Sequence, residues 1–337
     1  MSESATVFEG EELSGGSTPS ASPEEAKKFA GKSPMKLAWM RLRKDKLTMV
    51  SLTVVILVVL AAVLAPLLVK MGVLDPFSYN QDLLDANTIP EGRFSGASAA
   101  HPLGVEPGTG RDAMSRFWYG ITFSLAIALT AAILSVVIGA VVGIVSGFSG
   151  GWMDAGLSRF TDLTLSFPST LMLLALSALG LELVQQVTGL PNGPLAQGIY
   201  CTVVLAMFGW TSTARVVRGQ VLSIKQREFV EAAIVLGASK SRIYFKEILP
   251  NLWAPLLVLV TLMMPAYISA EAALSYLQVS VKPPTPTLGN VLADSLKYAQ
   301  VDPFYFFMPA ILIATIVISF NLLGDGLRDA LDPKGDR

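Results

Sequence analysis

The 337-residue chain has few charged residues, since Asp, Glu, Lys and Arg make up 15% of it and hydrophobic residues 52%. A water-soluble domain usually carries about 25% charged residues. This composition therefore excludes an ordinary soluble protein and predicts an integral membrane protein. The chain also has a single cysteine, which excludes an internal disulfide or a cysteine-based metal site. Cys201 lies in an apolar run, and we expect it to be a small buried residue.

The sequence has few candidates for catalytic residues. His101 is the single histidine, and we expect it to serve in a turn or in packing. The sequence has no Gly-x-x-x-x-Gly-Lys-[Ser/Thr] loop for binding phosphates. Any ATP that drives this protein must therefore be bound by another chain. We expect no catalytic residue, no metal and no cofactor in this chain.

The first 35 residues differ from the rest, because they are rich in Ser, Gly, Pro and Glu. Such a segment buries too little apolar surface to offset the entropy of ordering it. It also has no apolar core that would indicate a secretory signal peptide. We expect residues 1–35 to form a disordered cytosolic tail, ahead of a membrane domain over residues 36–337.

Six long apolar runs in residues 36–337 predict six transmembrane helices, because about 20 helical residues cross the hydrocarbon of a bilayer. The predicted fold class is an all-α integral membrane protein. Breaks rich in Gly and Pro shorten two of the runs. The expected spans are about 47–69, 121–147, 163–183, 197–215, 250–271 and 303–324. This leaves two long loops, 70–120 and 216–249.

The direction of the spans follows from the positions of Lys and Arg, which favour cytosolic segments. Most of the 25 Lys and Arg residues fall in segments on the same side as the N-terminus, including the run "RLRKDK" at Arg41–Lys46. Both termini are therefore expected in the cytosol. The loop 70–120 then lies outside, and the loop 216–249 lies in the cytosol.

The cytosolic loop contains the charged stretch "EAAIVLGASKSRIYFKEILP", residues 231–250. Phe229, Ala232, Ala233 and Leu236 share one helical face. Gly237 is suited to the left-handed conformation that ends a helix, and the serine two residues later is a suitable N-cap for a second helix. We expect a helix, a sharp turn and a helix. The alternative is an amphipathic connector that rests on lipid headgroups.

Three features of the spans are further candidates for function. Gly139, Gly143 and Gly147 form a stripe of small residues that lets helices pack closely, either within the chain or against a second membrane chain. Pro168 is expected to kink the third span, as a moving part or for packing alone. Glu271 ends the fifth span, where we expect a cap or a salt bridge; a gate contact is the alternative.

The stretch 231–250 closely resembles the cytosolic signature of ABC importer permeases. In that family the segment docks into a cleft on the ATP-hydrolysing subunit and transmits its motion. We take Ala238, which directly follows Gly237, as a further candidate. The candidate coupling residues are Glu231, Ala232, Ala233, Gly237, Ala238, Leu249 and Pro250.

Three more stretches are similar to the peptide and nickel branch of that family, in its second-permease type. They are "HPLGVEPGTGRDAMSRFWYGITFSL" at 101–125, "EAALSYLQVSVKPPTPTLGNVL" at 271–292 and "GDGLRDALDP" at 324–333. The resemblance covers residues from about 36 to the end. It implies the type I ABC importer permease fold and a place in the bacterial cytoplasmic membrane.

The resemblance also implies the function and the partners. The chain would be the permease subunit of an ATP-driven importer for short peptides, with no nucleic acid involved. Its partners would be a second permease, two ATP-binding subunits that hold ATP and Mg, an extracytoplasmic substrate-binding protein, the peptide and membrane lipid. One alternative is a permease of the same family for nickel or another small solute. Another is an ion-coupled carrier, which needs paired carboxylates or broken helices at mid-membrane.

Overall fold

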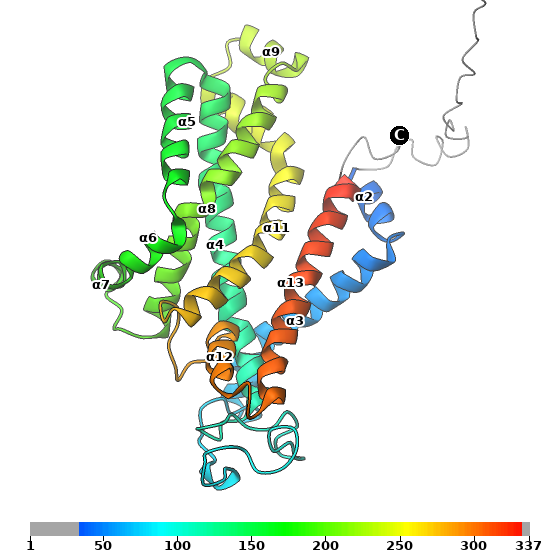
Figure 1. Cartoon of the computed structure of the whole chain (residues 1–337). Helices are drawn as coiled ribbons and strands as arrows, with labels where there is room; N and C mark the ends of the chain where they lie inside the picture. The colour runs from blue at the N-terminus through cyan, green and yellow to red at the C-terminus, as the bar shows by residue number, and fades with distance from the viewer. Residues whose placement is uncertain (1–33, 332–337) are drawn as a thin grey trace, which may run out of the picture.

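The structure is a computed structural model that describes residues 34–331, and every regular element in this range is a helix (Figure 1). Within residues 34–331, five helical segments are long and apolar enough to cross a membrane. Four of them are single helices: α3 (Lys46–Lys70), α4 (Ala113–Ser149), α8 (Pro194–Ile224) and α13 (Pro303–Leu331). The fifth is α11 (Leu249–Tyr276), preceded without a break by α10 (Lys240–Arg242) and the π-helical η2 (Ile243–Ile248).

The shorter elements lie before and between these spans. The helix α2 (Pro34–Leu42) precedes α3. The side chain of Asp45 caps α3 by accepting hydrogen bonds from the backbone N–H groups of Leu47 and Thr48. The other short elements are η1 (Gln81–Leu83), α9 (Glu228–Val235), α12 (Leu288–Ser295) and η3 (Leu296–Tyr298).

The region of the third expected span differs from a continuous helix over 163–183. It contains α5 (Gly151–Ser166), α6 (Ser169–Ala175) and α7 (Ser177–Thr188). Phe167 is extended, with φ −81° and ψ 129°, and Pro168 follows it. A proline disfavours the helical conformation in the residue before it and cannot donate a backbone hydrogen bond. Pro168 therefore ends α5 outright, where the sequence predicted a kink within one helix.

The glycine stripe of α4 lies against α8 of the same chain. A Cβ atom added to Gly139 would lie 2.5 Å from the Cβ of Thr213, and one added to Gly143 would lie 2.7 Å from the backbone oxygen of Ala214. An added Cβ on Gly147 would lie 2.9 Å from the side chain of Val221. The two backbones approach so closely that no larger residue fits between them without a shift.

Figure 1 shows that the bundle has two distinct ends. The segment 71–112 and α12 lie at one end, which we name the loop end. The helix α9 lies at the other end, with the remainder of segment 225–248 that joins α8 to α11; we name this the connector end. Because α4 has 37 residues, it is about 55 Å long and reaches from one end to the other.

Candidate functional site

The connector begins where α8 ends, and it is tied at once to α4. The amino group of Lys225 donates to the backbone oxygen of Phe148 at 2.8 Å and lies over the ring of that residue, 5.3 Å from its centre. The next helix, α9, has Glu228 and Glu231 in its first turn. Their negative charges are favourable there because backbone N–H groups at a helix N-terminus carry partial positive charge.

The helix α9 ends in a Schellman motif, as the positions of its backbone hydrogen bonds indicate. The N–H of Ala238 donates to the oxygen of Ala233 at 3.0 Å, and the N–H of Gly237 donates to the oxygen of Ile234 at 3.0 Å. Gly237 has φ +75°, and an added Cβ would meet no atom within 4 Å. The requirement for glycine is therefore conformational, since the space around it is open.

The chain continues into the membrane span through a capped turn. The hydroxyl of Ser239 accepts a hydrogen bond from the N–H of Arg242 at 3.3 Å, as the sequence predicted for the second helix. The π-helical η2 follows, and hydrogen-bonded residues in a π-helix are five apart. Ile243 and Ile248 have this spacing, and both are buried in the core cluster beneath the connector.

The connector leaves apolar side chains exposed next to its turn. Val230 is fully buried, and it is the buried residue of α9. By contrast, 85% of Val235 and 86% of Leu236 are exposed, and Ile234 is 45% exposed. We name Ile234, Val235 and Leu236 the apolar tip. Burying a valine or leucine side chain is worth about 1.5–3 kcal/mol, so an exposed cluster of this kind is a candidate binding surface.

Most of the candidate coupling residues lie around this tip. Glu231, Ala232 and Gly237 are exposed. Ala238 and Leu249 pack against the same buried cluster as Val230, and Pro250 is exposed in the first turn of α11. The remaining candidate, Ala233, is half-buried.

The helical face read in the sequence, which ends at Leu236, lies on the outside of α9. Its members are exposed or half-buried, while Val230 is the inward residue. Sequence reasoning missed that the apolar tip also includes Ile234 and Val235. The signal for it was the run of three bulky apolar residues directly before Gly237.

Glu271 lies elsewhere than expected. The fifth span continues to Tyr276, so Glu271 is inside α11 and fully buried. Its carboxylate accepts hydrogen bonds from the hydroxyls of Ser124, Ser275 and Ser280 at 2.9, 2.8 and 2.9 Å. Glu271 forms no ion pair within residues 34–331. The expected helix cap or salt bridge is therefore replaced by a shell of serine hydroxyls.

The loop end holds a buried ionic network centred on Glu106. An Oε2 atom of Glu106 lies 2.6 Å from Nε of Arg111 and 3.4 Å from Nε of Arg116, and the Tyr305 hydroxyl donates to Oε1 at 3.1 Å. Arg116 is fully buried and also donates to the backbone oxygen of Pro284 at 3.2 Å. Burial alone would raise the pKa of Glu106, but the charges of Arg116 and Arg111 lower it below its ordinary value.

His101 lies in the same loop, where it has a partner that supports a structural role. Its Nδ1 atom is 2.9 Å from Oδ1 of Asp112, whose other oxygen accepts a hydrogen bond from the N–H of Ser115 at 2.7 Å. Asp112 is the N-cap of α4, so the histidine braces a helix cap. In the part of the chain that the structure describes, no group of three His, Cys, Asp or Glu side chains is arranged to hold a metal.

Comparison with known proteins agrees with this architecture. Residues 139–336 match the family described as binding-protein-dependent transport system inner membrane component, and residues 33–90 match the N-terminal TM domain of oligopeptide transport permease C. The chain is 37% identical to the oligopeptide transport system permease protein OppC of Bacillus subtilis, over 93% of this chain and 95% of the relative. It is 34% identical to the dipeptide transport system permease protein DppC of Alkalihalophilus pseudofirmus, over 93% and 94% of the two chains.

A solved structure also resembles this fold. It is an inward-facing conformation of the MetNI methionine ABC transporter, with a TM-score of 0.50 and 20% identity over 65% of this chain and 97% of that chain. The architecture is therefore that of a type I ABC importer permease. The chain belongs to the family of binding-protein-dependent transport system inner membrane components, in its DppC and OppC type.

Proposed function

We propose that this chain is a permease subunit of an ATP-driven importer for short peptides, without catalytic activity of its own. Its relatives named above are dipeptide and oligopeptide permeases. The observation that carries the proposal is the apolar tip, held next to a Schellman turn on a connector that joins two membrane spans. Such a surface is suited to a cleft on an ATP-hydrolysing subunit, which would hold ATP and Mg.

The coupling in this proposal is mechanical. The connector is anchored by Val230, Ile243 and Ile248 in the core beneath it. Movement of a subunit bound to the tip would therefore tilt α8 and α11 together, as a rigid-body transition between inward-open and outward-open states. In this arrangement the connector end and both termini face the cytosol. A second permease completes the path, and a substrate-binding protein delivers the peptide at the loop end.

An ion-coupled carrier is the less favoured function. Such a protein needs paired carboxylates or comparable ion ligands near mid-membrane. The carboxylate of Glu271 is buried, but within the described residues its partners are serine hydroxyls that already donate to it.

Copurification of the complex tests the proposal. The Leu236→Asp variant, co-produced with the second permease and the ATP-binding subunits, is expected to lose most of the bound ATP-binding subunits and to keep the second permease. A charge on the tip opposes burial in an apolar cleft. Gln226→Asp adds the same charge at an exposed position of the connector outside residues 231–250 and serves as the control. Equal recovery of the ATP-binding subunits with Leu236→Asp and the wild type would contradict the proposal.

A further inference from the structure

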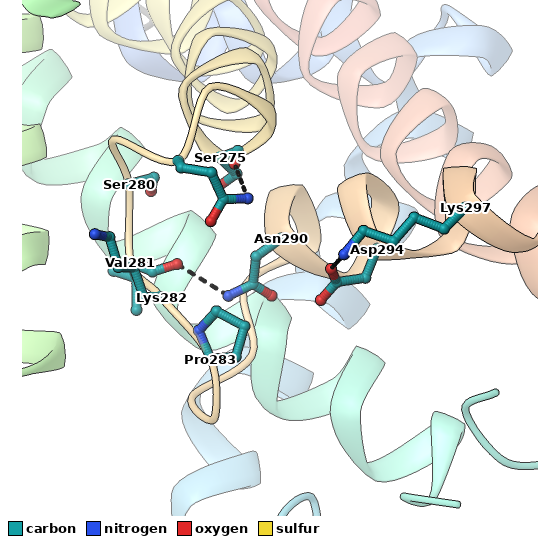
Figure 2. A pocket seen from close by; sticks show the side chains of 9 residues that line it. Ser275, Ser280, Val281, Lys282, Pro283, Asn290, Asp294 and Lys297 are labelled. Atoms are coloured by element: carbon teal, nitrogen blue, oxygen red, sulfur yellow. Dashed lines mark hydrogen bonds and ion pairs between the residues drawn. The ribbon is translucent and has the colours of Figure 1, made fainter. Parts of the chain in front are cut away.

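A cavity of about 260 Å³ opens at the loop end, beside the last turn of α11. Figure 2 shows Lys282 on one side of it and Asp294 and Lys297 on the other; the walls come from the segment after α11, from α12 and from η3. Ligand pockets for drug-sized molecules have about 300–1,000 Å³. This cavity is therefore large enough for one end of a short peptide.

The uncharged walls of the cavity are fixed by bonds inside the protein. The amide nitrogen of Asn290 donates to the backbone oxygens of Val281 and Thr285 at 3.0 and 2.9 Å, and its amide oxygen accepts from the N–H of Thr287 at 2.9 Å. The hydroxyls of Ser275 and Ser280 donate to the carboxylate buried behind them. These side chains shape the cavity, but their amide and hydroxyl donors already form hydrogen bonds inside the protein.

The charged groups at the rim remain available to a ligand. Lys297 lies 2.8 Å from Asp294, and that ion pair uses one of the three N–H donors of its ammonium. Lys282 is exposed, and its ammonium forms no ion pair with any residue from 34 to 331. Its backbone N–H donates to the side-chain oxygen of Gln197 at 2.9 Å, which holds this part of the loop against α8.

The balance of charge at the rim selects the chemistry of the ligand. Two lysines and one aspartate line this partly enclosed site, so its charged lining has a net positive charge. A carboxylate is the complementary group, because hydrogen bonds between ammonium and carboxylate are about twice as strong as neutral ones. A peptide with a free C-terminus supplies such a carboxylate.

We propose that this cavity binds the C-terminal carboxylate of the transported peptide, with Lys282 as its main charge partner and Lys297 as the second. The inference rests on the proposed function, since it takes the cargo to be a short peptide. The permease then binds the C-terminal end of the peptide as the peptide enters from the loop end. Peptides that lack the free carboxylate lose this contact.

The test compares two cargoes in the complete transporter, reconstituted in vesicles with its binding protein. ATP-driven uptake of alanyl-alanine and of its C-terminal amide is measured below saturation. In Lys282→Gln, uptake of the free acid is expected to fall about tenfold, as for loss of a charged hydrogen bond, and uptake of the amide to stay within about twofold of wild type. The binding protein is the same throughout, so its own preference cancels when the acid-to-amide ratios are compared.

Two matched variants separate charge from structure. Lys282→Arg keeps the positive charge and is expected to keep the wild-type ratio. Lys70→Gln removes an exposed lysine at the end of α3 and is expected to change neither cargo. An equal loss of both cargoes in Lys282→Gln, or no loss of the acid, would overturn the cavity as a carboxylate site and leave the proposed function standing. Failure of the wild-type complex to import either peptide would overturn both.

Discussion

The two ends of this molecule differ in which side chains they bury and which they expose. At the loop end, Glu106, Arg111 and Arg116 are buried and paired with one another, and Tyr305 completes the set. At the connector end, Val235 and Leu236 are almost fully exposed. The loop end buries these charged side chains as ion pairs within the chain, whereas the connector end leaves its largest apolar side chains exposed. This difference supports the proposal that another protein covers the apolar tip.

The largest effect on stability is expected from Glu106→Gln at the loop end. Removing one partner of a buried ionic network costs about 3–5 kcal/mol, because the other charges remain buried. Thermal unfolding of the purified chain in detergent is the measurement, and the midpoint should fall clearly below that of wild type. Glu91→Gln, at an exposed position of the same loop, is the control. Equal midpoints for the two variants would show that the network does not hold the loop end.

A smaller loss is expected where the two ends are joined along α4. In Gly143→Val, the new side chain would press on the backbone of Ala214 and on Val217, which lie 2.7 Å from an added Cβ. Overpacking of this kind costs about 1–3 kcal/mol. Gly219→Ala on α8 adds a Cβ with no atom within 4 Å and should leave the unfolding midpoint unchanged. An unchanged unfolding midpoint in Gly143→Val would show that α4 and α8 do not approach each other closely at this position.

The loop end should also give the chain its sensitivity to acid. The folded-state pKa of Glu106 is lowered from its ordinary value of 4.5, so its stabilising contribution is complete above that value and is lost as the pH falls through the lowered pKa. Uptake of one proton on unfolding makes the free energy of unfolding fall by about 1.4 kcal/mol for each pH unit of acidification. Unfolding midpoints measured from pH 7 to pH 3 should decline less steeply below about pH 4.5 in Glu106→Gln than in wild type. Parallel curves would contradict this origin.

The smallest effect on stability is expected at the apolar tip. Leu236→Ala removes a side chain that is 86% exposed, and such surface changes stay within about 0.5 kcal/mol. Val230→Ala, on the same helix but fully buried, is the matched variant and should destabilise the isolated chain more. A lower midpoint for Leu236→Ala than for Val230→Ala would mean that the tip is part of the core of this chain.

Local features of this fold could be predicted from the sequence. The turn at Gly237 and the cap at Ser239 depend on residues close together in the chain, and the structure has both. Five of the six expected spans are present because each is a long apolar run. The run 163–183 is also apolar, but Pro168 interrupts its helix. Hydropathy could not predict this break, because it does not report on backbone hydrogen bonds.

The buried polar clusters could not be predicted in the same way. The hydrogen bond from Tyr305 to Glu106 joins residues 199 apart, and that from Ser124 to Glu271 joins residues 147 apart. No periodicity or short motif connects such positions, because the contact exists only after the helices have packed. The inward position of Val230 in α9 could not be predicted for a related reason, since it depends on a buried cluster that includes Ile243 and Ile248.

We propose that the turn at Gly237 transmits ATP-driven motion, and one pair of variants tests this directly. Gly237 and Gly72 both have φ +75° with no atom near an added Cβ, so valine introduces similar strain, about 1–3 kcal/mol, at either position. Uptake per ATP hydrolysed is measured for Gly237→Val and Gly72→Val in vesicles that contain the complete transporter. We predict a fall of about tenfold or more for Gly237→Val and a value near wild type for Gly72→Val. Wild-type uptake per ATP in Gly237→Val would contradict the account.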